Sequence, residues 1–199
     1  NLGETRSRGA ELDAEWQRVC RHYPDANREG LCDGARDYEP WLAARTTWQV
    51  LDFYHASGYL AAAAPGMHRT KAERAQWLAE ACHALKHEHG AAQRLAKKMT
   101  IQAAKGARTR SAGAALEAAA GYFTHNVNRM NYSACAAMRM PIGSGVTEAA
   151  CGLIIKDRMC GRGMRWSLRM AQHLITLRAI IATTAGCWQR FWKSNFAAA

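Results

Sequence analysis

The chain has 199 residues and 49% of them are apolar, which is enough for a folded core, so intrinsic disorder is not expected. Its formal net charge is +11. No apolar run has the length of a membrane span and no signal-peptide pattern opens the chain, so we expect a soluble protein. Because the first residue is Asn rather than Met, we also expect a partial reading frame.

The basic excess is distributed unevenly along the chain. Residues 1–65 carry 7 basic and 10 acidic side chains (−3), residues 66–140 carry 12 and 4 (+8), and residues 141–199 carry 8 and 2 (+6). This asymmetry suggests a polyanionic partner, because Lys and Arg placed on phosphates release condensed counterions. A solvated helical surface explains the same charge equally well.

Seven cysteines are scattered along the chain without a CxxC pair. An odd number at irregular spacing argues against a disulfide framework and against a zinc ribbon, and a reducing cytoplasm fits best. His83 and His87 are four residues apart and can share one face of a helix. No Glu follows His83, so the HExxH pattern is absent, and an exposed helical face is the favoured interpretation.

The first part of the chain has the pattern of a small α/β unit. Residues 10–22 carry apolar side chains at helical spacing and are predicted to form a helix. A strand at about 29–33, a helix at 37–45 and a β-rich run at 48–54 follow. The order strand, helix, strand predicts a βαβ unit with a parallel sheet.

The rest of the chain is predicted to be helical. Residues 57–131 are rich in Ala, with Lys, Arg, Glu, Gln and Leu at helical intervals, and glycines divide them into three or four helices. Residues 141–145 form a turn, residues 146–159 a helix, and residues 167–185 the last long helix.

Three carboxylates are candidates for chemistry. Asp33 ends the first predicted strand, where a parallel sheet presents side chains to a ligand, although an Asp before a Gly is also typical of an ordinary turn. Asp52 would be buried unless it lies at the exit of the sheet; a structural hydrogen bond to His55 and a catalytic role both remain open. Glu148 lies near a helix N-terminus, where capping alone explains an acidic residue.

Seven short segments, spread along nearly the whole chain, bear on these alternatives. They are CDGARD at 32–37, VLDFYHA at 50–56, YFTHNVNRMNY at 122–132, PIGSGVTEAAC at 141–151, GMRW at 163–166, LITLRAI at 174–180 and RFW at 190–192. In this order and at similar spacing they resemble ISKra-type insertion-sequence transposases, which are enzymes of the DDE type. PIGSGVTEAAC with the downstream GMRW is the most specific part of the resemblance.

The resemblance implies an α/β, mainly helical chain with a partial RNase H-like fold. Residues 1–56 would be the partial core, made of a helix, the strand with Asp33, a second helix and the strand with Asp52. Residues 57–140 would be an all-helical insertion, and residues 141–199 the C-terminal helices of the core. The first strands, with the first catalytic Asp, would lie upstream of residue 1.

By position, Asp33 matches the second catalytic Asp of the family and Glu148 matches the catalytic Glu, while Asp52 and His55 match a supporting signature. The resemblance implies that Asp33 and Glu148 bind Mg²⁺ or Mn²⁺ in a two-metal site that cleaves DNA strands and transfers them during transposition. Three carboxylates are needed to hold two metals, so we expect the chain alone to be inactive. Transposon ends, target DNA and further copies of the chain are the implied partners.

Basic residues around a glycine break after the Glu148 helix are the first candidates for DNA contact. They are Lys156, Arg158, Arg162 and Arg165. Related sequences often have a basic residue where this chain has Gly152. Trp166 is expected to anchor the core.

A second basic patch lies in the helical insertion. Simple solvation is the alternative for both patches, and for the second it is slightly favoured. Its members are Lys97, Lys98, Lys105, Arg108 and Arg110. The alternative function for the whole chain is a non-catalytic basic helical protein that binds nucleic acid. In that protein Asp33 and Glu148 would serve only as capping residues.

Overall fold

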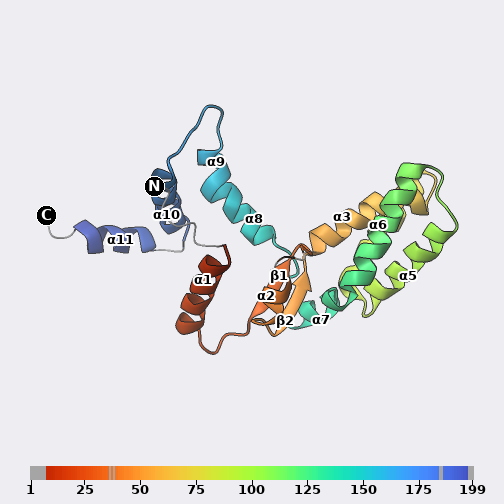
Figure 1. The fold of residues 1–199 in the computed structure, drawn as a ribbon, viewed down its shortest axis with the longest axis horizontal. Helices are drawn as coiled ribbons and strands as arrows, with labels where there is room; N and C mark the ends of the chain where they lie inside the picture. Colours follow the sequence, from red (N-terminus) through yellow and green to blue (C-terminus); the bar gives the residue numbers. More distant parts are fainter. Residues whose placement is uncertain (1–7, 36, 38, 184–185, 197–199) are drawn as a thin grey trace. The chain divides into compact units, whose positions relative to one another are not determined.

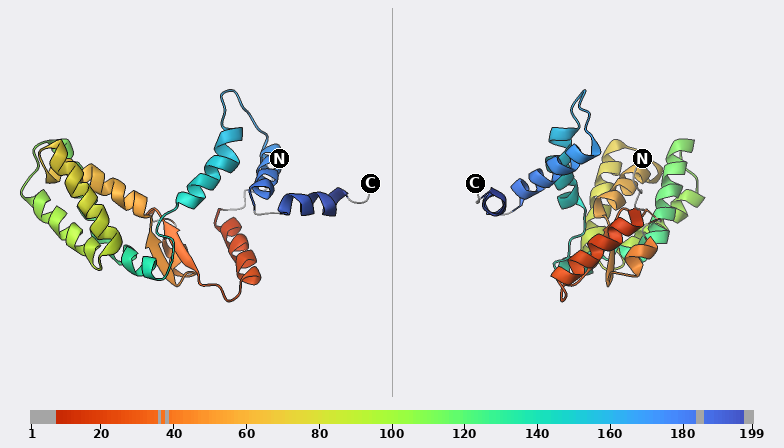
Figure 2. Two further views of the ribbon diagram at one scale, coloured as in Figure 1. Left: turned by 180° about the vertical axis from the view of Figure 1, so that it is seen from behind. Right: turned by 60° about the vertical axis from the view of Figure 1, so that its left-hand side comes forward.

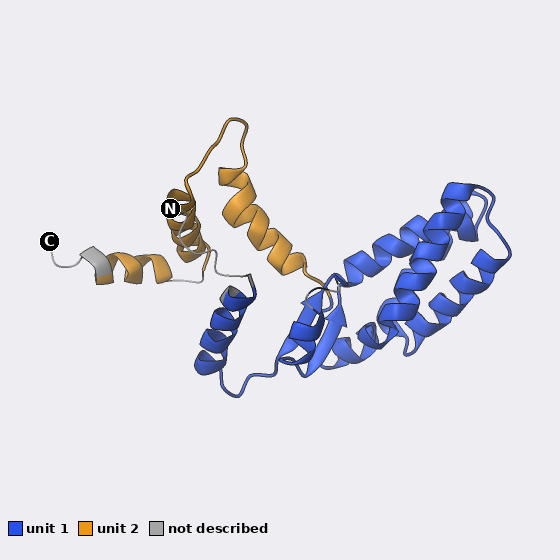
Figure 3. Cartoon of the chain, viewed as in Figure 1, with its two compact units in different colours: residues 1–142 blue, residues 143–199 orange. Residues whose placement is uncertain are grey.

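A computed structural model describes residues 8–35, 37, 39–183 and 186–196. The chain divides into two compact units, residues 1–142 and residues 143–199, which have different colours in Figure 3. It is mainly helical, with a short parallel sheet in the first unit (Figure 1). The prediction of a mainly helical α/β chain with a short parallel sheet is therefore confirmed.

The sheet pairs β1 (Glu29–Cys32) with β2 (Trp48–Leu51), and helix α2 (Glu39–Ala43) lies between them in sequence. The strands are parallel, with Glu29 opposite Trp48 at one end and Cys32 opposite Leu51 at the other. Val50 and Leu51 are fully buried, so the sheet is part of the core of the first unit.

Helix α1 (Arg8–His22) precedes the sheet and meets α2 through aromatic and polar contacts. Trp16 packs edge-on against Trp41 with ring centroids 5.8 Å apart. The carboxylate of Asp13 accepts hydrogen bonds from the Trp41 indole and the Arg45 guanidinium, both at 2.8 Å. Of the apolar side chains of α1, Trp16 therefore contacts α2, while Leu12 and Val19 are exposed.

The second strand is shorter than the predicted run of residues 48–54. It ends at Leu51, and helix α3 (Phe53–Met67) begins two residues later. The side chain of Asp52 accepts hydrogen bonds from the backbone N–H groups of Tyr54 and His55, so it caps α3. Aromatic residues at positions 53 and 54 suggested a strand, but the cap satisfies the first free N–H groups of a helix instead.

Four long helices follow the sheet, as expected for residues 57–131, and a short 3₁₀ turn and one more helix complete the unit. They are α3, α4 (Lys71–His87), α5 (Ala91–Ala104), α6 (Arg110–Asn126), the turn Val127–Arg129 and α7 (Tyr132–Ala137). Helix α3 packs against α6, and α6 packs against α5 (Figures 1 and 2). Leu60, Leu85, Leu116 and Phe123 are buried between them.

Two local signals explain where these helices begin and how closely they pack. At Thr70 a complete capping box with Glu73 starts α4, and the hydroxyl of Thr109 caps α6. A Cβ atom on Gly66 would lie 3.0 Å from Leu116, so the absence of a side chain at this position lets α3 and α6 approach each other.

The described residues of the second unit form one nearly continuous helical run and two further helices. The run consists of α8 (Gly145–Cys151), a π-helical turn (Gly152–Lys156) and α9 (Asp157–Met159), and it matches the predicted helix 146–159. Helix α10 (Leu168–Ala182) and helix α11 (Cys187–Phe196) follow. The predicted helix 167–185 ends at Ala182, and residues 184 and 185 lie outside the described residues.

The π turn is tied to α10. The guanidinium of Arg178 donates hydrogen bonds to the carbonyl of Ile154 at 2.7 Å and to the carbonyl of Leu153. A π turn disturbs the regular ladder of backbone hydrogen bonds, and Arg178 supplies donors to two carbonyls inside it. None of the helices in the described part of the chain has both the length and the apolar character that a membrane crossing requires.

Candidate functional site

Asp33 lies directly after β1 and its side chain is exposed. Its Oδ1 accepts a hydrogen bond from the backbone N–H of Ala35 at 2.9 Å, and Gly34 has a φ of +95°. This is the turn geometry that Asp-Gly sequences favour, because the carboxylate binds the backbone two residues on and Gly tolerates positive φ. The turn holds an exposed carboxylate at the carboxyl end of a parallel strand.

The Asp33 turn is fixed by aromatic side chains from two helices. The Tyr122 hydroxyl, from α6, donates a hydrogen bond to the Asp33 carbonyl at 2.9 Å. Tyr59, from α3, stacks on Tyr122 with ring centroids 3.8 Å apart. A Cβ atom on Gly34 would lie 3.2 Å from both Leu51 and Tyr122, so only glycine fits this packing without a shift. Burial, followed by the charges of Tyr59 and Asp33, raises the pKa of Tyr122, which keeps its hydroxyl a donor.

Behind this turn, a buried arginine joins the sheet to the end of α6. Arg129 is buried, and its guanidinium donates to Asn126 Oδ1 and lies 3.5 Å from a carboxylate oxygen of Glu39. Its Nη1 is also 3.8 Å from the sulfur of Cys32. The buried charge therefore has both an ion partner and a hydrogen-bond acceptor, as a buried guanidinium requires.

Asp52 follows β2 at the same edge of the sheet. Its backbone N–H donates to the Cys32 carbonyl at 2.7 Å, which continues the ladder by one residue and places Asp52 beside the end of β1. Its side chain is 1% exposed and caps α3 through Tyr54 and His55. The Nδ1 atom of His55 is 3.8 Å from Asp52 Oδ1, which is too long for a hydrogen bond. The Asp52–His55 contact is thus made by the His55 backbone, while its imidazole is half exposed.

Tyr132 is a further side chain near this edge. It is fully buried, its ring packs edge-on against Phe53 at 5.4 Å, and its hydroxyl has no hydrogen-bond partner among the described residues. Burial and then the charges of Tyr122 and Asp52 raise its pKa. Tyr122, Arg129 and Tyr132 belong to the segment 122–132, and no local pattern marks their individual roles because their partners are distant in sequence.

Glu148 belongs to the first turn of α8 in the second unit and is exposed. Its Oε1 accepts a hydrogen bond from the Ser144 hydroxyl at 2.8 Å, and its backbone N–H donates to the Ser144 carbonyl at 2.9 Å. The capping interpretation is consistent with this geometry, and an exposed carboxylate is equally able to reach an ion. Asp33 and Glu148 lie in different units, and their convergence stays a prediction.

The four basic residues proposed for DNA contact are all exposed. Lys156 ends the π turn, and Arg162 and Arg165 stand on either side of Gly163, which has a φ of +78°. Trp166 is 42% exposed, and its indole N–H donates to the Met159 carbonyl at 3.1 Å. The indole thus secures the glycine-containing loop to the end of α9 instead of filling the core, as the sequence had suggested.

The remaining candidates lie on helix surfaces of the first unit. The five residues of the second basic patch are exposed, which agrees with solvation and does not by itself favour binding. The rings of His83 and His87 are 4.7 Å apart on the exposed side of α4. Within the described ranges, no group of three or more His, Cys, Asp or Glu side chains is placed to hold a metal ion.

The chain was compared with models of protein families, with curated proteins and with solved structures. None of the three comparisons finds a match.

Proposed function

We propose that the chain is the C-terminal part of a DDE-type transposase of the ISKra kind, with an RNase H-like core that cleaves DNA strands and transfers them. One observation supports this proposal most directly. Two aspartates follow the two neighbouring strands of a parallel sheet, and the first of them, Asp33, presents an exposed carboxylate at that edge. Ligands of open α/β sheets bind at this edge.

The two aspartates have different environments and so different proposed roles. Asp33 is exposed and held by its turn, so its carboxylate is available as a hard oxygen ligand for Mg²⁺ or Mn²⁺. Asp52 is buried and engaged as a helix cap, so it supports the site by fixing the start of α3. Glu148 supplies the second ligand oxygen on this proposal. Bound metals would supply a nucleophile and neutralise charge on the phosphate.

The residues of the chain contribute position and charge to this chemistry. Tyr122 and Gly34 fix the turn that carries Asp33, so the ligand oxygen is oriented before any ion arrives. Lys156 and the arginines near it would hold backbone phosphates. On this proposal a third carboxylate comes from outside residues 1–199, so strand cleavage is not expected from these residues alone.

Calorimetric titration with Mn²⁺ tests the ligand assignment without requiring turnover. We expect weak binding, with Kd on the order of millimolar, that Asp33→Asn and Glu148→Gln each weaken by at least about tenfold. Glu117→Gln is the matched control, because Glu117 is exposed on α6 and is not a proposed ligand. Equal binding by all four proteins would show that Asp33 and Glu148 are not ligands.

The second candidate, a non-catalytic nucleic-acid-binding protein, is supported by the exposed basic residues of the second unit. It predicts DNA binding that is independent of Mn²⁺ and unchanged in Asp33→Asn and Glu148→Gln. The first candidate predicts that Mn²⁺ strengthens binding to DNA in the parent chain and that neither variant responds to it. A mobility-shift titration with and without Mn²⁺ separates the two.

A further inference from the structure

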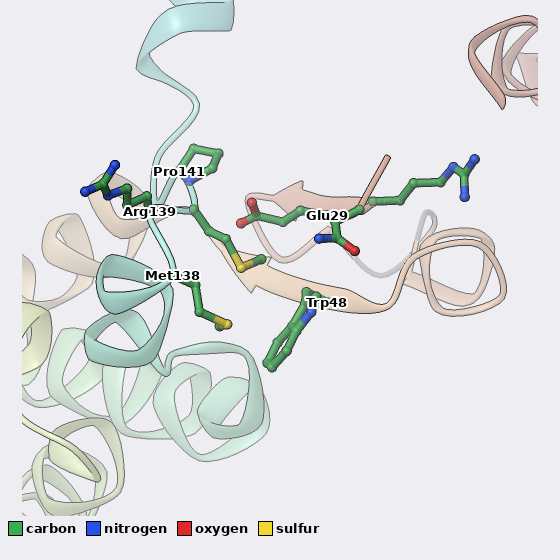
Figure 4. A pocket seen from close by; sticks show the side chains of 8 residues that line it. Glu29, Trp48, Met138, Arg139 and Pro141 are labelled. Atoms are coloured by element: carbon green, nitrogen blue, oxygen red, sulfur yellow. The ribbon is translucent and has the colours of Figure 1, made fainter. Parts of the chain in front are cut away.

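The first unit contains a pocket at the amino-terminal ends of the two strands, at the opposite end of the sheet from Asp33 and Asp52. Its volume is about 430 Å³ and Figure 4 shows it from close by. It is lined by Asn27, Arg28, Glu29, Trp48, Met138, Arg139, Met140 and Pro141. All eight residues belong to the first unit, so the pocket is complete within it.

Glu29 gives the pocket an unsatisfied acceptor. Its Oε1 is buried and has no hydrogen-bond partner among the described residues. Burial raises the pKa of this carboxyl. Burial, followed by the charge of the same carboxylate, raises the pKa of the Cys135 thiol. A buried carboxylate oxygen without a donor costs folding free energy, and a donor brought by a ligand would remove that cost.

Trp48 forms the neighbouring wall. It is the register partner of Glu29, so both side chains leave the same face of the parallel sheet. The indole is 42% exposed, although it is one of the largest apolar side chains of the unit. Met138, Met140 and Pro141 complete an apolar lining around it. The face of an indole next to a carboxylate attracts an organic cation.

The two arginines of the lining do not neutralise Glu29. The guanidinium of Arg28 donates to the carbonyls of Tyr23 and Pro24 at 3.2 and 3.1 Å and lies 5.7 Å from the Trp16 ring. In Figure 4 the guanidinium of Arg139 points away from Glu29 and Trp48. Neither forms an ion pair with Glu29 in the part of the chain that the structure describes.

The methionine wall is shaped by the turn that ends α7. Met140 donates its backbone N–H to the Cys135 carbonyl, and Arg139 donates to the Ala136 carbonyl, which together are the hydrogen bonds of a Schellman motif. Arg139 therefore has a φ of +56° at a position where glycine is usual. Non-glycine residues in this conformation carry strain and are enriched at binding sites.

We propose that this pocket binds a guanidinium group, which stacks on Trp48 and donates paired hydrogen bonds to Glu29. A guanidinium fits better than an ammonium ion because it is planar, weakly hydrated and able to bind a carboxylate through two parallel N–H groups. The group comes either from an arginine side chain of a polypeptide or from a free guanidino compound. This site is independent of the proposed transposase function, since none of its residues takes part there.

Calorimetric titration with N-acetyl-L-arginine amide tests the site in the parent chain, in Glu29→Gln and in Glu117→Gln. Saturable binding to the parent chain and to Glu117→Gln, weakened at least about tenfold in Glu29→Gln, is the expected result. N-acetyl-L-citrulline amide, which has nearly the same shape without the charge, is expected not to bind. N-acetyl-L-lysine amide is expected to bind more weakly than the arginine compound.

Equal binding to Glu29→Gln and the parent chain would overturn the proposal, as would equal binding of the citrulline or the lysine compound. Failure of the arginine compound to bind at all would also overturn it. Thermal melting followed by circular dichroism verifies that Glu29→Gln is folded. Trp48→Leu gives a second variant, which keeps the carboxylate and loses the indole, and it too is expected to bind more weakly. Agmatine represents a free guanidino compound and the peptide acetyl-Gly-Arg-Gly-amide represents an arginine side chain of a polypeptide. The one that binds more tightly indicates the source of the group.

Discussion

The hydroxyl of Tyr122 donates a hydrogen bond to the carbonyl of Asp33 at 2.9 Å, across 89 positions of sequence. The bond joins α6 to the carboxyl end of β1, and the stacked ring of Tyr59 brings α3 to the same point. The helices after the sheet therefore hold the turn on which the proposed metal ligand stands. Changes within these helices should alter the position of Asp33 although no residue of theirs is a proposed ligand.

Replacing Tyr122 by Phe tests this connection. We expect Tyr122→Phe to lower the free energy of unfolding by about 0.5–1 kcal/mol, because one hydrogen bond at a half-exposed position is lost while the stacked ring remains. Mn²⁺ binding should weaken as well, since Asp33 becomes less well oriented. Urea unfolding measures the first effect and calorimetry the second.

Tyr54→Phe is the control for Tyr122→Phe, because Tyr54 is 66% exposed and its loss of a hydroxyl should change neither quantity. Equal unfolding midpoints for the parent chain and Tyr122→Phe would mean that the bond does not hold the turn. A loss of stability with unchanged Mn²⁺ affinity would mean that the Tyr122 hydrogen bond stabilises the turn but does not affect metal binding by Asp33.

Local patterns in the sequence were sufficient to predict the strand–helix–strand unit and the long helices. Alternation of residue types, capping residues and glycine breaks act over a few positions, and the parallel order of the strands follows from the helix between them. The predicted end of the second strand, at residue 54, was wrong because Phe53 and Tyr54 have high strand propensity. The hydrogen bonds of Asp52 to the backbone decide that boundary in favour of a helix.

Contacts between distant parts of the chain could not be predicted in this way. Tyr122 of α6 and Arg129 of the following 3₁₀ turn contact residues at the end of β1, and no local sequence pattern specifies these contacts. The pocket beside Glu29 depends on where α7 ends relative to the sheet. The π turn that starts at Gly152 gave no signal beyond a glycine in mid-helix, and the carbonyls it displaces are bound by Arg178 from another helix.

Gly34 provides a test of the packing at the Asp33 turn. Gly34→Ala should lower the free energy of unfolding by about 1–2 kcal/mol or more, because alanine disfavours positive φ and its Cβ would press on Leu51 and Tyr122. Gly121→Ala, in the interior of α6 with no atom near its would-be Cβ, should instead raise stability by about 0.5–1 kcal/mol. If both alanines changed the urea midpoint in the same direction, the close packing at Gly34 would be in doubt.

The raised pKa of Glu29 gives a pH-dependent prediction. A carboxyl whose pKa is higher in the folded chain than in the unfolded chain holds its proton more tightly when folded. Its ionisation therefore lowers the free energy of unfolding as pH rises from the unfolded-state pKa through the folded-state pKa. Below the ordinary pKa of 4.5, Glu29 is protonated in both the folded and the unfolded chain, so this loss of stability disappears. Glutamine does not ionise, so Glu29→Gln should have a higher Tm than the parent chain at about pH 7, with the difference closing below about pH 4.

Melting curves of both proteins across this range measure the effect, with Glu117→Gln as the exposed control. A lower Tm for Glu29→Gln at neutral pH would contradict the assignment, because it would mean that the carboxylate already has a partner such as Arg139.

The same outcome would predict that Arg139→Gly loses stability. With Glu29 unpaired, Arg139→Gly should gain up to about 1 kcal/mol instead, since glycine adopts the observed φ without strain.

The salt dependence of DNA binding decides which basic patch contacts phosphate. For duplex DNA, each phosphate contact contributes about −0.9 to the slope of log K against log salt concentration. Replacing Lys156, Arg158, Arg162 and Arg165 together by Gln should therefore make the slope less negative by about 3 to 4 if all four contact phosphates. Replacing Lys97, Lys98 and Lys105 by Gln removes exposed charge from the first unit and should leave the slope nearly unchanged. The reverse result would mean that the helices of the first unit contact the DNA. Equal changes in slope from both sets of substitutions would indicate attraction by net charge without a defined binding surface.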